Sequence, residues 1–210
     1  MGEAQSSLRA QKKLQTQHRI LDVAVKLFQE QGFDNTSFEE VAEEASVSRA
    51  TVFNYFPSKR DLLRAIGLDE LGKLRRMAEE DLCDVESAVA RIRLVMRQLV
   101  SDTLPYLNVT RYVIVSSMLY PSAEAPASLG LGEILHRLVV EAQQRGEIRS
   151  NLSPVEVSHA ISGAYLAVFL ERVSHSESAA RDDEPDVSSI VDMLFEGIAG
   201  PAYCTPPALE

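Results

Sequence analysis

Apolar residues recur at every third or fourth position along almost the whole chain, and this periodicity limits the fold most. Near the start, Ile20, Ala24, Leu27 and Phe28 share one face of a helix with 3.6 residues per turn. The strict alternation of apolar and polar residues that is typical of strands is nearly absent. The sequence therefore predicts an all-α protein of about nine helices.

Capping and breaking residues predict where these helices begin and end. Ser37 and Glu40 form a capping box that starts a second helix after a first one over residues 17–31. Ser48 caps a third short helix, which must end near Tyr55 because Pro57 cannot continue it. Further helices are expected over residues 59–80, 85–104, up to 120, 133–145, 154–173 and 186–198, with loops at 121–132 and 174–185.

Two short helices joined by a tight turn form the outline of a helix-turn-helix. The segment Thr36 to Leu63, including Ser48-Arg49-Ala50-Thr51-Val52-Phe53-Asn54-Tyr55-Phe56-Pro57, resembles the DNA-binding domain of the TetR family of bacterial repressors, and Arg19 to Phe33 resembles that family's first helix. The resemblance covers residues 17–66. It departs from the family at Ser46, where Gly is usual, and at Phe53, where Tyr is frequent.

The resemblance implies a division of the chain into a basic N-terminal arm (1–16), a DNA-binding domain (17–66), a helical effector-binding and dimerisation domain (67–199) and a flexible tail (200–210). The charge distribution fits this division. The 210 residues carry a net charge of -10, but residues 1–66 hold nine basic and nine acidic residues, so the excess acid lies entirely beyond them. Arg9, Lys12 and Lys13 make the arm a candidate for phosphate contacts.

The third helix is expected to read DNA mainly through its N-terminal residues. Arg49 suits a bidentate contact with guanine, Ala50 a thymine methyl and Thr51 a base or a phosphate. Alone, such an Arg is more often a solvated surface residue and such a Tyr a packed aromatic. Glu39 either accepts from a cytosine amine or repels non-specific DNA. The predicted DNA-binding residues are Ser37, Arg49, Ala50, Thr51, Asn54, Tyr55 and Lys59, of which Asn54, Tyr55 and Lys59 are assigned to phosphates.

The last two helices expose more apolar surface than one core requires, and the resemblance implies that they form a four-helix bundle with a second copy. The predicted dimer residues are Ala160, Gly163, Ala164, Ala167, Ile190, Val191 and Leu194. A ligand cavity is expected among the middle helices. Its predicted lining is Met96, Leu99, Tyr112, Ser116, Tyr120, His136, Tyr165 and Phe169, although each of these is also a candidate for ordinary core. Methionines adapt to varied shapes, which favours a hydrophobic or amphipathic effector.

The sequence therefore predicts a homodimeric repressor that a small effector releases from a palindromic operator. One alternative is a DNA-binding adaptor controlled by a protein partner; another is an enzyme with a dispersed active site, although no catalytic motif is present. Cys83 and Cys204 form no metal or redox motif, and no cofactor is expected. Without a signal peptide or an apolar run of ~18 residues, a cytoplasmic protein is expected. The effector, the operator and the choice between repression and activation do not follow from the sequence.

Overall fold

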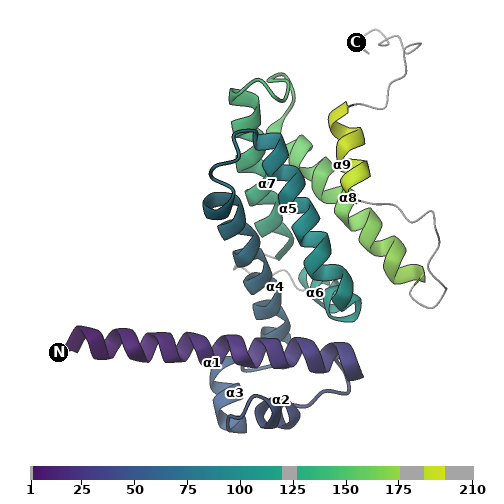
Figure 1. Ribbon diagram of the computed structural model, residues 1–210. Helices are drawn as coiled ribbons and strands as arrows, with labels where there is room; N and C mark the ends of the chain where they lie inside the picture. Colours follow the sequence, from purple (N-terminus) through teal and green to yellow (C-terminus); the bar gives the residue numbers. More distant parts are fainter. Residues whose placement is uncertain (1, 120–126, 176–186, 197–210) are drawn as a thin grey trace.

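The computed structural model describes residues 2–119, 127–175 and 187–196, and every regular element in these ranges is helical (Figure 1). This confirms the predicted all-α fold. No described helix is both long and apolar enough to cross a membrane. In chain order the helices are α1 (Gly2–Gln31), α2 (Phe38–Glu44), α3 (Arg49–Tyr55), α4 (Lys59–Arg76), α5 (Ala88–Thr103), α6 (Leu107–Leu119), α7 (Ala127–Gln144), α8 (Pro154–His175) and α9 (Val187–Glu196).

Helices α1, α2 and α3 pack with the first turns of α4 around one apolar cluster, here called the N-terminal core. Its buried members are Ile20, Leu21, Ala24, Phe28, Phe38, Val41, Ala42, Ala45, Val52, Phe56, Leu62, Leu63 and Val109. The predicted caps are present: Ser37 and Glu40 form the capping box, and Ser48 and Ser58 each accept a backbone hydrogen bond. Ser46 adopts φ 52°, the left-handed conformation of the turn for which Gly is usual.

The first helix begins much earlier than the predicted residue 17. It includes the segment of Arg9, Lys12 and Lys13, so the described part of the basic arm is a helical extension of α1 rather than a separate arm. Figure 1 shows this extension projecting beyond the remaining helices. Good helix formers dominate it, and nothing in residues 2–16 breaks a helix, so propensity favours continuation.

Helices α4 to α9 surround a second cluster, here called the C-terminal core. Its buried members are Leu74, Ala78, Ala88, Ile92, Val95, Met96, Leu99, Leu131, Ile134, Leu135, Leu138, Val139, Ala142, Ile148, Ile161, Tyr165, Val168, Phe169 and Val191. A single π-helical turn η1 (Met77–Asp81) ends α4, and a 3-10 turn η2 (Leu104–Tyr106) joins α5 to α6. Helix α7 begins at Ala127 rather than 133, so residues 127–132 of the predicted loop belong to this helix. Helix α5 begins after its cap Ser87.

Helix α6 connects the two cores, a contact that the sequence did not predict. Val109 is buried in the N-terminal core, and the ring of Tyr112 lies 4.9 Å from that of Phe33 between centroids. The Tyr112 hydroxyl donates to the Asp34 carboxylate at 3.0 Å. The N-terminal core is therefore held by α6 as well as by α4, which runs out of it without interruption.

Candidate DNA-binding and ligand-binding sites

Helix α3 presents one face to solvent while Val52 anchors the other in the N-terminal core. Arg49, Ala50 and Asn54 are exposed, as the prediction of base and phosphate contacts requires. Thr51 is half-buried, and its hydroxyl hydrogen-bonds that of Ser48 at 2.8 Å. The exposed N-terminal turn of α3 is therefore the part of this helix that is available to a major groove.

The guanidinium of Arg49 is held in place from two sides. Its Nε lies 2.7 Å from Oε1 of Glu39 on α2, and its Cζ lies 5.1 Å from the centroid of the Phe53 ring. Phe53 in turn packs edge-on against Phe38, with ring centroids 4.7 Å apart. Glu39 and Phe53 are thus positioning candidates for Arg49. The sequence placed them nearby without showing this arrangement, because it depends on how α2 crosses α3.

Two predicted phosphate contacts are tied to other parts of the N-terminal domain. Tyr55 donates its hydroxyl to the backbone carbonyl of Lys13 at 3.2 Å, which links α3 to the extension of α1. Lys59 donates to the carbonyl of Asp34 at 3.2 Å, and its ammonium lies 4.6 Å from the centroid of the Phe33 ring. To reach a phosphate, the Tyr55 hydroxyl and the Lys59 ammonium group would each have to leave these partners or bind the phosphate in addition to them. Ser37 is occupied by its capping box with Glu40.

The predicted ligand-binding residues that the structure describes lie in different surroundings. Met96, Leu99, Tyr165 and Phe169 are buried together in the C-terminal core. Tyr112 belongs to the contact with the N-terminal core instead, which corrects its placement in a pocket. Ser116 and His136 are half-buried, and Tyr120 lies outside the described residues.

The buried Tyr165 hydroxyl has a polar partner within the bundle. It donates to Thr103 Oγ1 at 3.0 Å, and Thr103 donates to the carbonyl of Leu99 at 2.6 Å. Burial raises the pKa of Tyr165 to about 12, with the nearby Glu70 charge adding to the effect against the hydrogen bond with Thr103. Tyr165 therefore acts as a neutral hydrogen-bonding group within this core.

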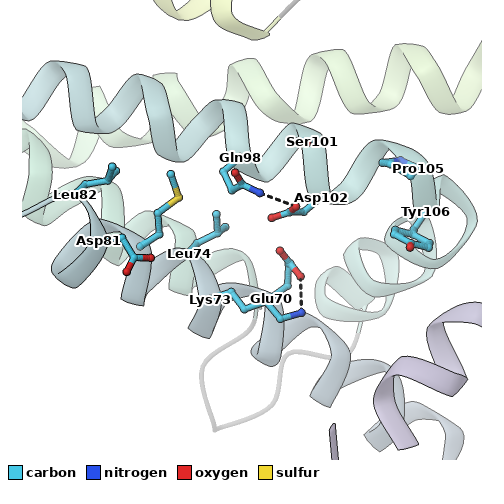
Figure 2. A pocket seen from close by; sticks show the side chains of 11 residues that line it. Glu70, Lys73, Leu74, Asp81, Leu82, Gln98, Ser101, Asp102, Pro105 and Tyr106 are labelled. Carbon is cyan, nitrogen blue, oxygen red and sulfur yellow. Dashed lines mark hydrogen bonds and ion pairs between the residues drawn. The ribbon is translucent and has the colours of Figure 1, made fainter. Parts of the chain in front are cut away.

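An open cleft of about 760 Å³ lies instead between α4 and α5, at a place the sequence did not indicate (Figure 2). Helix α4 contributes an acidic, a basic and an apolar side chain to it, and α5 contributes an amide and a second carboxylate. None of the seven predicted ligand-binding residues that lie in the described ranges is part of its lining. The lining is Glu70, Lys73, Leu74, Met77, Asp81, Leu82, Gln98, Ser101, Asp102, Pro105 and Tyr106.

Charged groups are held close together inside this cleft. Lys73 Nζ lies 3.4 Å from Glu70 Oε2 and 3.1 Å from Asp69 Oδ2, while Gln98 donates to Asp102 at 2.7 Å. Partial burial raises the pKa of Glu70, and the neighbouring Asp102 carboxyl raises it further, against the attraction of Lys73. The cleft therefore holds a carboxyl group, that of Glu70, which retains its proton more readily than an ordinary glutamate.

Glu70→Gln should stabilise the protein at neutral pH. The folded state binds a proton on Glu70 more tightly than the unfolded chain does. The contribution of Glu70 to the free energy of unfolding is therefore most favourable at a pH below 4.5, the ordinary pKa of this carboxyl group, and it declines as the pH rises through the raised pKa of the folded state. Gln cannot ionise, so its advantage over Glu should appear at pH 7 and vanish near pH 4. Thermal unfolding of both proteins across this range measures it. A wild type that is more stable than the variant at pH 7 would contradict the electrostatic account of the cleft.

Helix α8 exposes three small residues and, one turn further along the helix, a leucine. Ala160, Gly163 and Ala167 face solvent, and Leu170 is 53% exposed. A Cβ added at Gly163 would meet no atom of the chain within 4 Å, so packing inside the protomer does not require glycine there.

Helix α9 packs against α5 and α8 and also leaves apolar side chains exposed, Met193 at 45% and Leu194 at 41%. Ile190 beside them is half-buried. Two residues of the predicted dimer surface lie elsewhere: Ala164 and Val191 are buried within the protomer, so neither is available to a partner chain. The helical period accounts for this, since Ala164 and Val191 fall on the inward faces of α8 and α9.

Comparisons with known proteins agree with this architecture. The family model described as bacterial regulatory proteins, tetR family, matches residues 20–66, which hold α2, α3 and most of the N-terminal core. The transcriptional regulator LuxR of Vibrio harveyi is 24% identical over 189 residues, covering 86% of this chain and 89% of its own. The transcriptional repressor KstR of Rhodococcus jostii is 25% identical over 201 residues, covering 95% of this chain and 89% of its own.

Solved structures resemble the whole fold. The Thermus thermophilus repressor FadR in complex with lauroyl-CoA superposes with a TM-score of 0.64 at 23% identity, covering 92% of this chain and 99% of its own. This likeness concerns the fold, whereas the family model concerns the sequence of residues 20–66 and the two curated relatives concern the sequence over most of the chain. Taken together with the exposed face of α3, the family model shows that residues 20–66 form a helix-turn-helix domain of the TetR family of bacterial regulators, and the relatives matched over most of the chain are transcriptional regulators.

Proposed function

We propose that this regulator is a homodimeric repressor that leaves a palindromic operator when a small amphipathic effector occupies its helical domain. The observation that carries the proposal is the course of α4. Leu62 and Leu63, near the start of this helix, are buried in the N-terminal core, while Glu70 and Lys73 further along line the cleft. A ligand that shifts α4 at the cleft would therefore move the DNA-binding domain, and linkage requires DNA and ligand to oppose each other's binding.

Residues 17–66 would contact DNA in this proposal, and residues 67–199 would hold the effector and the partner chain. Arg49, Ala50 and Thr51 would face bases, and Asn54, Tyr55 and Lys59 would face phosphates. The basic extension of α1 is connected to α3 by the hydrogen bond between Tyr55 and Lys13, so it is placed to add phosphate contacts beside the recognition helix.

The second copy would cover the exposed apolar faces of α8 and α9. Small residues on α8 allow two helices to approach closely, and Leu170, Met193 and Leu194 supply apolar area that water now contacts. A dimer also explains how one short recognition helix suffices, because two of them about 34–36 Å apart read successive major grooves.

The cleft supports an amphipathic effector because its lining has an apolar part and a polar part. Leu74, Met77 and Leu82 form an apolar part, and Glu70, Gln98 and Asp102 form a polar part. Its volume of about 760 Å³ lies within the range of small-molecule sites, about 300–1,000 Å³.

Transcription in vitro tests the repressor. DNA bound by the protein is first selected from the chromosomal region around its gene, and the promoter that contains the selected site is then transcribed with and without the protein. Fewer transcripts with the protein are expected. More transcripts would identify an activator, and unchanged transcription from an occupied site would refute direct control of that promoter.

The charge distribution predicts a modest salt dependence of operator binding. Residues 1–66 have no net charge and the acidic remainder repels the duplex, so few phosphates should be neutralised. We expect a plot of log K against log salt with a slope no steeper than about -5 per dimer. Fluorescence anisotropy at several salt concentrations measures it, and a slope near -10 would show that many more basic residues reach the DNA.

A further inference from the structure

The cleft between α4 and α5 has more negative charge than its polar partners compensate. Three carboxyl groups line it, those of Glu70, Asp81 and Asp102, against one ammonium group, that of Lys73. Lys73 is shared with Asp69, whose Oδ2 it approaches at 3.1 Å, nearer than Oε2 of Glu70 at 3.4 Å. The positive charge of Lys73 is thus drawn toward a carboxylate that does not line the cleft.

One oxygen atom in the cleft lacks a hydrogen-bond donor. Oε1 of Glu70 is buried from solvent and has no partner, while Oε2 of the same carboxyl group contacts Lys73. Figure 2 shows the Glu70 carboxyl reaching from α4 toward the Asp102 carboxyl on α5. A buried acceptor without a donor is costly, so a ligand that donates a hydrogen bond to Oε1 would be favoured over one that accepts.

The size and chemistry of the cleft distinguish an organic cation from a metal ion. No group of three or more His, Cys, Asp or Glu in the described ranges is arranged to hold a metal. The volume far exceeds that of a bare ion, and the apolar side chains of Leu74, Met77 and Leu82 form part of the lining. The ring of Tyr106, which is 42% exposed, adds an aromatic face of the kind that attracts cations.

We infer that this cleft binds a protonated organic amine, with its ammonium group between Glu70 and Asp102 and its apolar part against Leu74, Met77 and Leu82. An ammonium group has up to three N–H donors, so it can serve Oε1 of Glu70 and an Asp102 oxygen at once. The inference rests on the proposed function, because it names the class of effector for the cleft that the proposal invokes.

The same charges disfavour polyanionic ligands in this cleft. An acyl-CoA carries several phosphate charges, which the three carboxyl groups would repel, although the structurally similar FadR of Thermus thermophilus was solved with lauroyl-CoA. Likeness in fold therefore does not carry over to the ligand. An ammonium group would instead relieve the repulsion between Glu70 on α4 and Asp102 on α5 and draw the two helices together.

Binding of matched cations and neutral molecules tests the inference. The probes are aliphatic, aromatic and polyamine cations, each paired with a neutral alcohol of the same skeleton, such as phenethylamine with 2-phenylethanol, and lauroyl-CoA serves as the anionic probe. Thermal shift and calorimetry on the full chain should show at least one amine binding at least tenfold more tightly than its alcohol. If no cation in the panel outperforms its neutral partner, or if lauroyl-CoA displaces the amine from the cleft, the inference fails.

The affinity of variants for the amine that binds tests where on the protein it binds. Glu70→Gln and Asp102→Asn should each weaken it at least tenfold, whereas Glu133→Gln, which removes a carboxylate that pairs with Arg75 outside the cleft, should leave it unchanged. Equal affinity in wild type and Glu70→Gln would overturn the site. Glu70→Gln is expected to fold at least as well as wild type, so lost binding in this variant would not reflect unfolding.

Operator binding in the presence of the amine separates the two proposals. If the amine binds at Glu70 and operator affinity does not change, the cleft assignment holds and the inducer model fails. If another molecule releases the operator equally well from wild type and Glu70→Gln, the inducer model holds and the cleft assignment fails.

Discussion

Arg49→Ala is expected to weaken binding to the selected operator by about 5- to 150-fold, or ~1–3 kcal/mol, and to relax the preference at one base pair of each half-site. The guanidinium is exposed at the first turn of α3 and oriented by Glu39 and Phe53, so its loss removes a contact to a base edge. Binding to unrelated DNA should change little. Anisotropy titrations on the operator, on single-base variants and on unrelated DNA measure the three quantities, and an equal loss on every sequence would reassign Arg49 to a phosphate.

Glu39→Gln is the matched test of positioning. It leaves Glu39's carbon skeleton in place but removes the charge that holds Arg49 Nε at 2.7 Å. We expect the preference at the Arg49 base pair to broaden while binding to unrelated DNA stays the same or improves, since a negative charge beside the duplex is lost. Glu43→Gln removes an exposed acid of the same helix and serves as the control. The guanidinium of Arg49 is held by Glu39 and Phe53 rather than by Glu43, so this variant should leave the base preference intact.

Gly163→Glu should convert the dimer to a monomer and lower operator affinity by more than 100-fold. In a monomer, no second DNA-binding domain is held close to the second half-site, so the gain from binding two half-sites at once is lost. The substitution should not harm the protomer, because a Cβ at Gly163 meets nothing within 4 Å and replacing glycine inside a helix gains about 1 kcal/mol of propensity. Sedimentation should give twice the chain mass of 23.2 kDa for wild type and the chain mass for the variant.

Gly132→Glu in α7 is the control for charge and for loss of glycine. Its Cβ also meets nothing within 4 Å, and it lies on α7 rather than on α8 or α9. We expect this variant to remain dimeric and to bind the operator as wild type does. A Gly163→Glu protein that stays dimeric with full operator affinity would place the partner chain on another surface.

The helix-turn-helix could be predicted closely because its boundaries depend on local chemistry. Ser37 with Glu40, and Ser48 and Ser58, supply side-chain caps to neighbouring amides, and Pro57 ends α3. Such interactions lie within four residues of each other, so they are readable without a tertiary structure. The extension of α1 was missed because helix propensity in residues 2–16 is not accompanied by an apolar face, the signal that marks amphipathic helices.

The candidate ligand site could not be predicted because it depends on contacts between distant segments. Apolar and aromatic residues such as Met96 and Phe169 suit a cavity lining and a filled core equally well, and packing placed them in the core. Tyr112 reaches Asp34, 78 residues away in the chain, instead of a pocket. In the sequence, nothing distinguishes the charged residues Glu70 and Asp102 from solvated positions on two separate helices. The pairing of α4 with α5 places both of them in the lining of one cleft (Figure 2).

Selection of bound sequences from a random DNA pool by the full chain tests the central claim most directly, namely that a dimer reads an operator through α3. The account predicts an enriched palindrome whose half-sites lie about 10–10.5 base pairs apart between centres, or a multiple of this, with a guanine in each half-site whose enrichment disappears with Arg49→Ala. Enrichment of an asymmetric single site, or of no sequence at all, would contradict it.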